Sequence, residues 1–312
     1  MKIRPGTGDA LRMVAGAAIL ALILAVVWHF RQEASPAQQL AFKASRVDLV
    51  GRMQVALASA SEAEKSAVLA ITDTDSQTFA DQARAATTDV ERERQELGKL
   101  LATGGTQRER DLLAQFSGAF DALQRIDDEV LRLAVKNTNL KAYALLFGPA
   151  AETLAEMDAA LSRVVAKRAD SPDAKRVMRL AFGARIGILR VQALLAPHIA
   201  EESDEKMDRL EVSMATEETQ VRKDLDGLAA LPELAGDADL AKAATSFVRY
   251  GELEVRILAL SRENTNVRSL GLSLNQKRKA MTLCLDDLSA LKQAITEEPI
   301  AGLTGGRPPL PR

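Results

Sequence analysis

The tetrapeptide ENTN, Glu263–Asn266, lies inside a strongly helical pattern, and a near copy, KNTN, occupies Lys136–Asn139. Asparagine and threonine are unfavourable in helix interiors, because their side chains compete for the backbone hydrogen bonds. The first asparagines of the two copies, Asn137 and Asn264, are 127 residues apart. A polar triplet that recurs in an otherwise aliphatic chain predicts an internal repeat.

Further identities occur at the same offset of 127 residues. They pair Ser76 with Ser203, Asp81 with Asp208, Glu91 with Glu218, Phe120 with Phe247 and Leu133 with Leu260. Leucines of amphipathic helices match by chance, but the polar triplet is not explained in that way. We therefore predict two related helical modules, divided near Ala169–Asp173.

The composition favours an all-α fold. The chain has 312 residues, of which 47% are hydrophobic, 27% charged and only 4% aromatic. Alanine, leucine, glutamate and arginine dominate, which is typical of helical bundles with aliphatic seams. The net charge is −2, and no basic stripe is interleaved with aromatic residues, so nucleic-acid binding is not expected.

Helix boundaries follow from capping signals and from apolar residues spaced by three and four. Ser35-Pro36 and Ser171-Pro172 fit an N-cap followed by proline at the first helical position. Thr74 with Gln77, and Thr106 with Glu109, fit the capping box. One apolar seam comprises Phe79, Ala83, Ala86, Val90, Leu97 and Leu101, and another comprises Leu113, Phe116, Phe120, Leu123, Val130 and Ala134.

The N-terminus predicts a single membrane anchor. Basic residues in 1–12 precede the apolar segment Met13–Phe30, so we expect a cytoplasmic N-terminus and a transmembrane helix over 13–30. A cleaved signal peptide is the alternative, but the nearest small-residue site, Ser35-Pro36-Ala37, lies far downstream. No later stretch is expected to cross the membrane. The bulk of the chain is therefore expected in the periplasm, with a disordered tail at 297–312.

Two longer stretches carry a family resemblance. EKSAVLAITDTDSQTFADQA, residues 64–83, predicts two helices joined by an acidic turn, and FDALQRIDDEVLRLAVKNTNLKAYALLFG, residues 120–148, follows. The second half is similar again, in FVRYGELEVRILALSRENTNVRSLGLSLNQKRKA, residues 247–280. Together they resemble the four-helix-bundle sensory domain of methyl-accepting chemotaxis receptors, in two tandem copies.

The resemblance implies two up-down four-helix bundles, one over 37–168 and one over 173–296. The implied helices lie at about 37–72, 75–102, 107–138, 140–168, 173–198, 202–231, 237–264 and 266–296. Asn-Thr-Asn would then turn or cap the chain between the third and fourth helices of each module. An alternative is one long bundle of four unbroken helices of about 60 residues, in which the asparagines would make polar contacts.

Few residues suggest catalysis or metal binding, so we expect a protein that is not an enzyme and has no cofactor. The only histidines are His29 and His198. His198 with Glu201 and Glu202 is interpreted as an exposed turn of mixed charge rather than a metal cluster. Asp127, Asp128 and Glu129 are interpreted as a solvated face. The single cysteine, Cys284, is interpreted as a packed hydrophobe.

Two classes of function remain open. The first is a membrane-anchored sensory or ligand-binding protein that resembles a chemoreceptor input domain, forms a homodimer or binds a partner receptor, and lacks its own signalling output. The second is a structural or adaptor protein that holds membrane partners on its helical surface. A receptor gene that has lost its signalling half is a further interpretation. No ligand-binding residue is assigned, although receptors of this kind hold anions with arginines, and Arg176, Arg179, Arg185 and Arg190 are the candidates.

Overall fold

A computed structural model describes residues 35–300. The expected cytoplasmic segment 1–12, the expected membrane helix 13–30 and tail residues 301–312 lie outside this range. The described residues form helices joined by short turns and contain no strand, which confirms the all-α prediction. The elements are α2 (Pro36–Leu69), α3 (Asp73–Gly104), α4 (Gln107–Ala134), α5 (Thr138–Leu145), η1 (Leu146–Ala150), α6 (Ala151–Lys167), α7 (Ala174–Ala200), α8 (Asp204–Ala229), η2 (Pro232–Leu234), α9 (Ala238–Glu263), α10 (Thr265–Leu272), η3 (Ser273–Lys277) and α11 (Arg278–Glu297).

Two of the four predicted capping sites, at Ser35 and Thr106, fix helix starts. The N-cap expected at Ser171 is wrong, because α7 begins at Ala174 after an N-cap at Asp173. In the capping box before α4, the Thr106 N–H donates to Glu109 Oε2 at 3.0 Å and the Glu109 N–H donates to Thr106 Oγ1 at 3.2 Å. Ser35 and Gln38 make the equivalent pair before α2. The box expected at Thr74 is wrong, because the N–H of Asp75 bonds to Thr72 Oγ1 instead.

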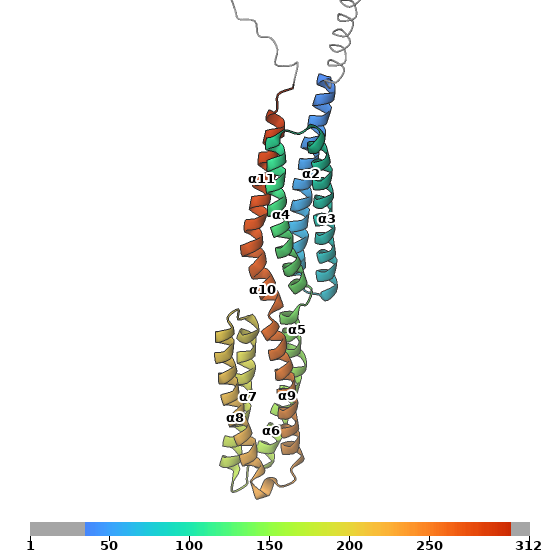
Figure 1. Cartoon of the computed structure of the whole chain (residues 1–312). Coiled ribbons are helices and arrows are strands. Elements are labelled where there is room, and N and C mark those ends of the chain that lie inside the picture. The colour runs from blue at the N-terminus through green and yellow to red at the C-terminus, as the bar shows by residue number, and fades with distance from the viewer. Residues whose placement is uncertain (1–34, 301–312) are drawn as a thin grey trace, which may run out of the picture. The chain divides into compact units, whose positions relative to one another are not determined.

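The chain divides into two compact units, and several helices contribute to both. Unit 1 comprises residues 35–56, 89–118 and 284–300 of the described chain. Its buried residues come from α2, α3, α4 and α11, and include Leu49, Met53, Leu97, Phe116, Leu288 and Ile295. Figure 1 shows these helices side by side. Buried ion pairing also holds them, because Arg46 on α2 contacts Glu109 at 2.7 Å and Glu298 at 2.6 Å.

Unit 2 comprises residues 57–88 and 119–283. Its largest core combines buried residues of α5, η1 and α6 with those of α7, α8 and α9. The members include Leu146, Met157, Leu161, Val164, Ile188, Val191, Leu195, Met214, Leu228, Phe247, Tyr250 and Ile257. Figure 1 shows α6, α7, α8 and α9 running side by side.

This core corrects the predicted division at Ala169–Asp173. Residues 138–167 pack with residues 174–263 in one core, so the boundary between 37–168 and 173–296 falls at a turn between packed helices. Conversely, α10 and η3 pack against the first repeat, because Leu272 joins the cluster of Val68, Val130 and Ala134. The two repeats therefore exchange their fourth helices.

The repeat itself is visible in the backbone. Asn137 and Asn264 have left-handed conformations, with φ of 50° and 52°. Each is followed by an eight-residue α-helix and then by five residues of π-helix, η1 and η3. The alternative of four unbroken helices is wrong, because the chain also leaves the helix at the acidic turns near 70–72 and 201–203.

Helix α7 is, within the described chain, the one helix long and apolar enough to span a membrane by length and composition. Its composition has a local explanation, because one face lies in the unit 2 core and another is an exposed apolar stripe. That stripe comprises Met178, Phe182, Ile186 and Leu189, which are 43–52% exposed.

Candidate functional site

The two Asn-Thr-Asn motifs meet in unit 2 and cap each other's helices. The Thr138 N–H donates to Thr265 Oγ1 at 3.2 Å, and the Thr265 N–H donates to Thr138 Oγ1 at 3.1 Å. The N–H groups of Asn139 and Asn266 likewise donate to each other's side-chain Oδ1, at 3.2 and 3.1 Å. The first N–H groups of an α-helix lack intrahelical partners. Each motif supplies those partners to the other.

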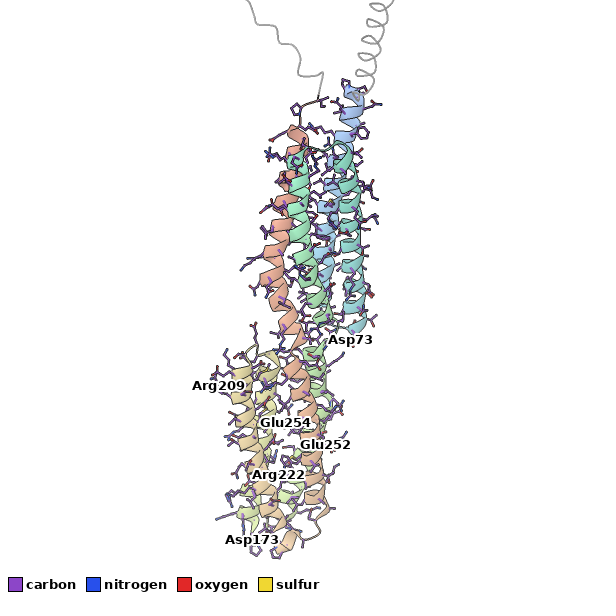
Figure 2. The ribbon with its side chains drawn as sticks, viewed as in Figure 1. Asp73, Asp173, Arg209, Arg222, Glu252 and Glu254 are labelled. Carbon is purple, nitrogen blue, oxygen red and sulfur yellow. The ribbon has the colours of Figure 1, made fainter. Side chains whose placement is uncertain are left out.

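The side-chain amides complete a reciprocal network. Asn139 Nδ2 donates to Asn264 Oδ1 at 2.8 Å, and Asn266 Nδ2 donates to Asn137 Oδ1 at 2.9 Å. Asn137 also donates to Asp73, which lies at the start of α3 (labelled in Figure 2). Lys141 contacts the same carboxylate at 3.0 Å. These two donors, Lys141 first, lower the pKa of Asp73. The predicted capping role is confirmed, but the caps are exchanged between repeats, which sequence spacing alone does not show.

We call the set of Asn137, Thr138, Asn139, Asn264, Thr265 and Asn266 the crossover. The crossover is also tied to the end of α7. Asn139 Nδ2 donates to the carbonyl oxygen of Ile199, and Asn264 Nδ2 donates to that of Glu201, at 2.6 and 2.7 Å. Ile199 lies in the last turn of α7, where its carbonyl group has no intrahelical donor, and Glu201 follows the end of that helix. The crossover therefore fixes the turn between α7 and α8.

His198 lies under the crossover and is fully buried, so its interpretation as part of an exposed turn is wrong. Its Nδ1 is 2.8 Å from Ser261 Oγ, and its Nε2 is 2.9 Å from Glu211 Oε1. Since a carboxylate only accepts, Nε2 carries the proton and donates to Glu211. Burial, opposed by Glu211, lowers the pKa of His198, which keeps the imidazole neutral.

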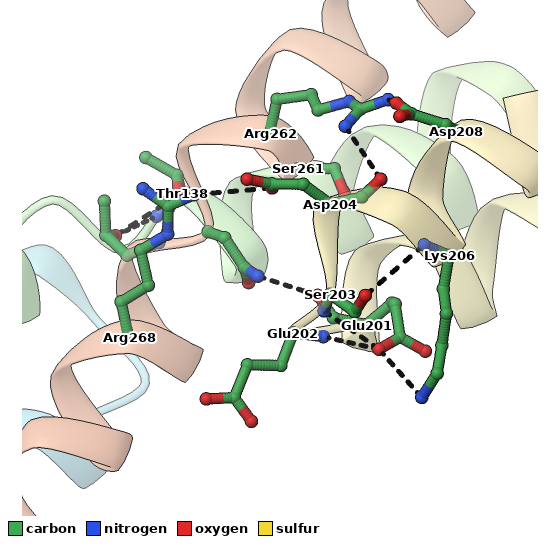
Figure 3. Close-up of polar contacts among 12 residues, drawn as sticks. Thr138, Glu201, Glu202, Ser203, Asp204, Lys206, Asp208, Ser261, Arg262 and Arg268 are labelled. Atoms are coloured by element: carbon green, nitrogen blue, oxygen red, sulfur yellow. Dashed lines mark hydrogen bonds and ion pairs between the residues drawn. The ribbon is translucent and has the colours of Figure 1, made fainter.

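Charged groups at the surface extend this network (Figure 3). Arg262 contacts Glu211 at 2.7 Å and Asp208 at 2.5 Å, and Lys206 contacts Glu201 at 3.4 Å. No group of three or more histidine, cysteine, aspartate or glutamate residues among residues 35–300 is arranged to hold a metal ion. The contacts around His198 join α7, α8 and α9.

A second buried network joins α2, α4 and η3. Lys277 Nζ lies 2.7 Å from Glu64 Oε2 and 3.1 Å from Asp127 Oδ1. All three residues are at most 7% exposed, and one lysine faces two carboxylates. Burial raises the pKa of Asp127 to about 6, although Lys277 opposes the shift. The interpretation of Asp127 as part of a solvated face is wrong, whereas Asp128 is exposed.

A further buried acid lies among the core residues of α9. Glu254, on α9 (Figure 2), is 4% exposed, and burial together with the neighbouring Glu218 raises its pKa to about 9. The Tyr250 hydroxyl, one turn earlier, is buried without a hydrogen-bond partner among the described residues. Burial and the neighbouring Glu218 therefore favour the protonated form of Glu254.

One cavity of unit 2 lies between η1–α6 and α7 and has a volume of about 540 Å³. It falls within the usual range for small-molecule sites, roughly 300–1,000 Å³. Its walls are Phe147, Ala151, Leu154, Ala155, Met157, Asp158, Arg185, Ile188, Leu189, Gln192, Ala193 and Ala196. We call this the α6–α7 cavity.

Of the four arginines considered from sequence, only Arg185 lines the α6–α7 cavity. Arg190 pairs with Glu217 on α8 at 3.2 Å, and Arg176 and Arg179 are exposed. Sequence reasoning missed Gln192 and Phe147, since neither stands out from a helical pattern. Cys284 is fully buried, in agreement with its interpretation as a packed residue.

The fold defines an all-helical bundle protein. Residues 47–174 match the family model described as a four helix bundle sensory module for signal transduction. The resemblance to chemoreceptor sensory domains is thus confirmed for this part of the chain, and the matched family is a signal-transduction module rather than an enzyme family. The match covers α2 to α6, so a second copy of the module at 173–296 remains a prediction. No curated protein matches the chain.

Proposed function

We propose that this protein is a sensory, ligand-binding protein, anchored in the cytoplasmic membrane by residues 13–30 and exposed on the periplasmic side. The observation that carries the proposal is the match of residues 47–174 to a four-helix-bundle sensory module. The α6–α7 cavity supports it, because its volume suits a small molecule. Homodimerisation, or association with a partner receptor, would supply the signalling output.

The crossover suggests how binding could be transmitted. Phe147 of η1 lines the cavity, and α5 precedes η1 directly. The first N–H groups of α5 are capped by Thr265 and Asn266, which open α10. A ligand that displaces η1 and α5 would also displace α10, because the paired caps connect the two helices. Packed cores and hydrogen-bond networks switch between discrete arrangements rather than deforming continuously.

Ligand-dependent stabilisation of the full-length protein in detergent tests this function. A ligand present at about 100 times its Kd stabilises the folded state by about 2.7 kcal/mol. We expect at least one compound among amino acids, organic acids and neutral aromatic molecules to raise the melting temperature. If none of them does, the sensory proposal fails. Alkaline phosphatase fused after Arg312 tests the topology, since the fusion is active only if that end is periplasmic.

An adaptor function is a second candidate, favoured by the exposed stripe of Met178, Phe182, Ile186 and Leu189 on α7. Exposed apolar patches often mark protein interaction sites. The adaptor function predicts that Phe182→Glu with Ile186→Glu abolishes co-purification of a membrane partner and that no small molecule changes the melting temperature.

A further inference from the structure

Another cavity of unit 2 lies between α3 and α4 and has a volume of about 320 Å³. This volume is near the lower end of the usual range for small-molecule sites, roughly 300–1,000 Å³. Its polar walls consist of Arg84, Thr87 and Thr88 on α3 and of Gln124, Asp127 and Asp128 on α4. Each set has helical spacing, so each forms one face of its helix. We call this the α3–α4 cavity.

Asp127 presents one carboxylate oxygen to the α3–α4 cavity. Its side chain is 10% exposed, and Lys277 Nζ lies 3.1 Å from Oδ1, which is closed to solvent. The other oxygen, Oδ2, stays open to solvent and accepts no hydrogen bond from any described residue. A ligand in the cavity can therefore reach Oδ2 of a largely buried carboxylate.

The carboxylates near the cavity outnumber the cations. Lys277 is shared between Glu64 and Asp127, at 2.7 and 3.1 Å. Asp128, the next residue of α4, makes no ion pair or hydrogen bond within the described part of the chain. Burial is the main cause of the raised pKa of Asp127, and the charges of Glu64 and Asp128 add to it. Excess negative charge around the cavity favours a cationic ligand.

The remaining polar groups of the cavity leave this charge in place and offer acceptors. Arg84, the one cation among the lining residues, is paired with Asp81 at 3.0 Å. The hydroxyl groups of Thr87 and Thr88 donate to backbone carbonyl groups of α3, at 3.0 and 2.9 Å, so their oxygens are left as acceptors. Gln124 is half-buried and has an amide oxygen that accepts no hydrogen bond from residues 35–300. A primary ammonium group, with three donors and no acceptor, matches this set.

An organic cation fits the cavity better than a metal ion. No group of three or more histidine, cysteine, aspartate or glutamate residues within the described chain is arranged to hold a metal. The volume leaves room for an aliphatic body, and Leu131 supplies apolar surface for it.

We propose that the α3–α4 cavity binds a short aliphatic diamine, with one ammonium group on Asp127 Oδ2, the other at Asp128, and the methylene groups against Leu131. This site is separate from the α6–α7 cavity, so the inference goes beyond the function proposed above and does not require a ligand there.

Three compounds of similar length form matched probes: 1,4-diaminobutane, 1,4-butanediol and 4-aminobutyrate. We expect 1,4-diaminobutane to raise the melting temperature of the full-length protein in nonionic detergent. Its Kd by calorimetry should be at least tenfold lower than that of either other probe. Asp127→Asn should raise this Kd at least tenfold and Asp128→Asn about threefold, because charge-assisted hydrogen bonds are stronger when buried. Asp121→Asn, at an exposed position of α4 outside the cavity, should leave it unchanged.

The unliganded melting temperature and circular dichroism spectrum of each variant show whether it folds. No binding of 1,4-diaminobutane to the folded wild type, or binding that survives Asp127→Asn, overturns the inference. Tighter binding of 4-aminobutyrate overturns it too, since Arg84 would then pair with a carboxylate. Mg²⁺ or Ca²⁺ that displaces the diamine and loses its own affinity in Asp127→Asn would make the cavity a metal site instead. The sensory function is tested with other classes of compound, so it stands if this inference alone fails.

Discussion

Asp127→Asn tests the buried network of Glu64, Asp127 and Lys277. Burial raises the pKa of Asp127 from 3.8 to about 6, so between these values the folded protein binds more protons than the unfolded chain. Stability from this group is present below pH 3.8 and is lost as the pH rises through 6. About two pH units at 1.36 kcal/mol per unit give about 3 kcal/mol, most of which is lost between pH 4 and pH 7.

Asparagine cannot ionise, so the variant lacks this loss. Relative to wild type, Asp127→Asn should gain about 2–3 kcal/mol between pH 4 and pH 7. Lys277 keeps its contact with Glu64 at 2.7 Å, so the remaining pair is neutral. Urea denaturation at pH 4, 5, 6 and 7 measures the difference directly, with Asp128→Asn as a control that removes the same charge from the exposed neighbouring position. A difference between Asp127→Asn and wild type that is constant with pH would refute the reasoning.

Further predictions concern the crossover, helix packing and His198. Asn264→Ala should destabilise the protein by about 1–2 kcal/mol more than Asn264→Gly in chemical denaturation, because alanine is strained at a φ of 52°, and equal losses would contradict the left-handed assignment. Gly187→Ala should lower the melting temperature, because an added Cβ would lie 2.6 Å from Val221. Gly251→Ala should stabilise the protein by about 0.5–1 kcal/mol and so raise its melting temperature, since nothing lies within 4 Å of the added Cβ. Because the pKa of His198 lies below 6.5, its contribution to stability should be lost as the pH falls below 6.5, and His198→Gln should reduce that dependence in urea titrations between pH 5 and 7.

The sequence predicted the helices well because helix formation is local. The spacing of apolar residues and capping signals such as Thr106 with Glu109 act within one or two turns. The expected C-terminal ends of the helices accordingly lie within four residues of the observed ones. The Asn-Thr-Asn repeat also predicted correctly where the chain leaves the helix.

Which helices pack together could not be predicted in the same way. Two amphipathic repeats of similar composition present similar apolar seams, so α6 suits the helices of either repeat. The exchange depends on whether the chain turns back or continues after Asn137 and Asn264, and that direction is set by contacts 127 residues apart. The buried Asp127 and His198 were misjudged for the same reason, since their partners Lys277 and Ser261 are remote in sequence.

The central structural claim is that the two Asn-Thr-Asn motifs meet face to face, which places the fourth helix of each repeat with the other repeat. Thr138 Oγ1 and Thr265 Oγ1 lie 3.2 Å apart, so cysteines at both positions are within reach of a disulfide. The direct measurement is the mobility of Thr138→Cys/Thr265→Cys in a Cys284→Ala background on non-reducing gels after mild oxidation. We predict an intramolecular disulfide in nearly all molecules, absent from either single-cysteine variant. Free thiols, or disulfides only between chains, would contradict the exchange and favour two separate bundles.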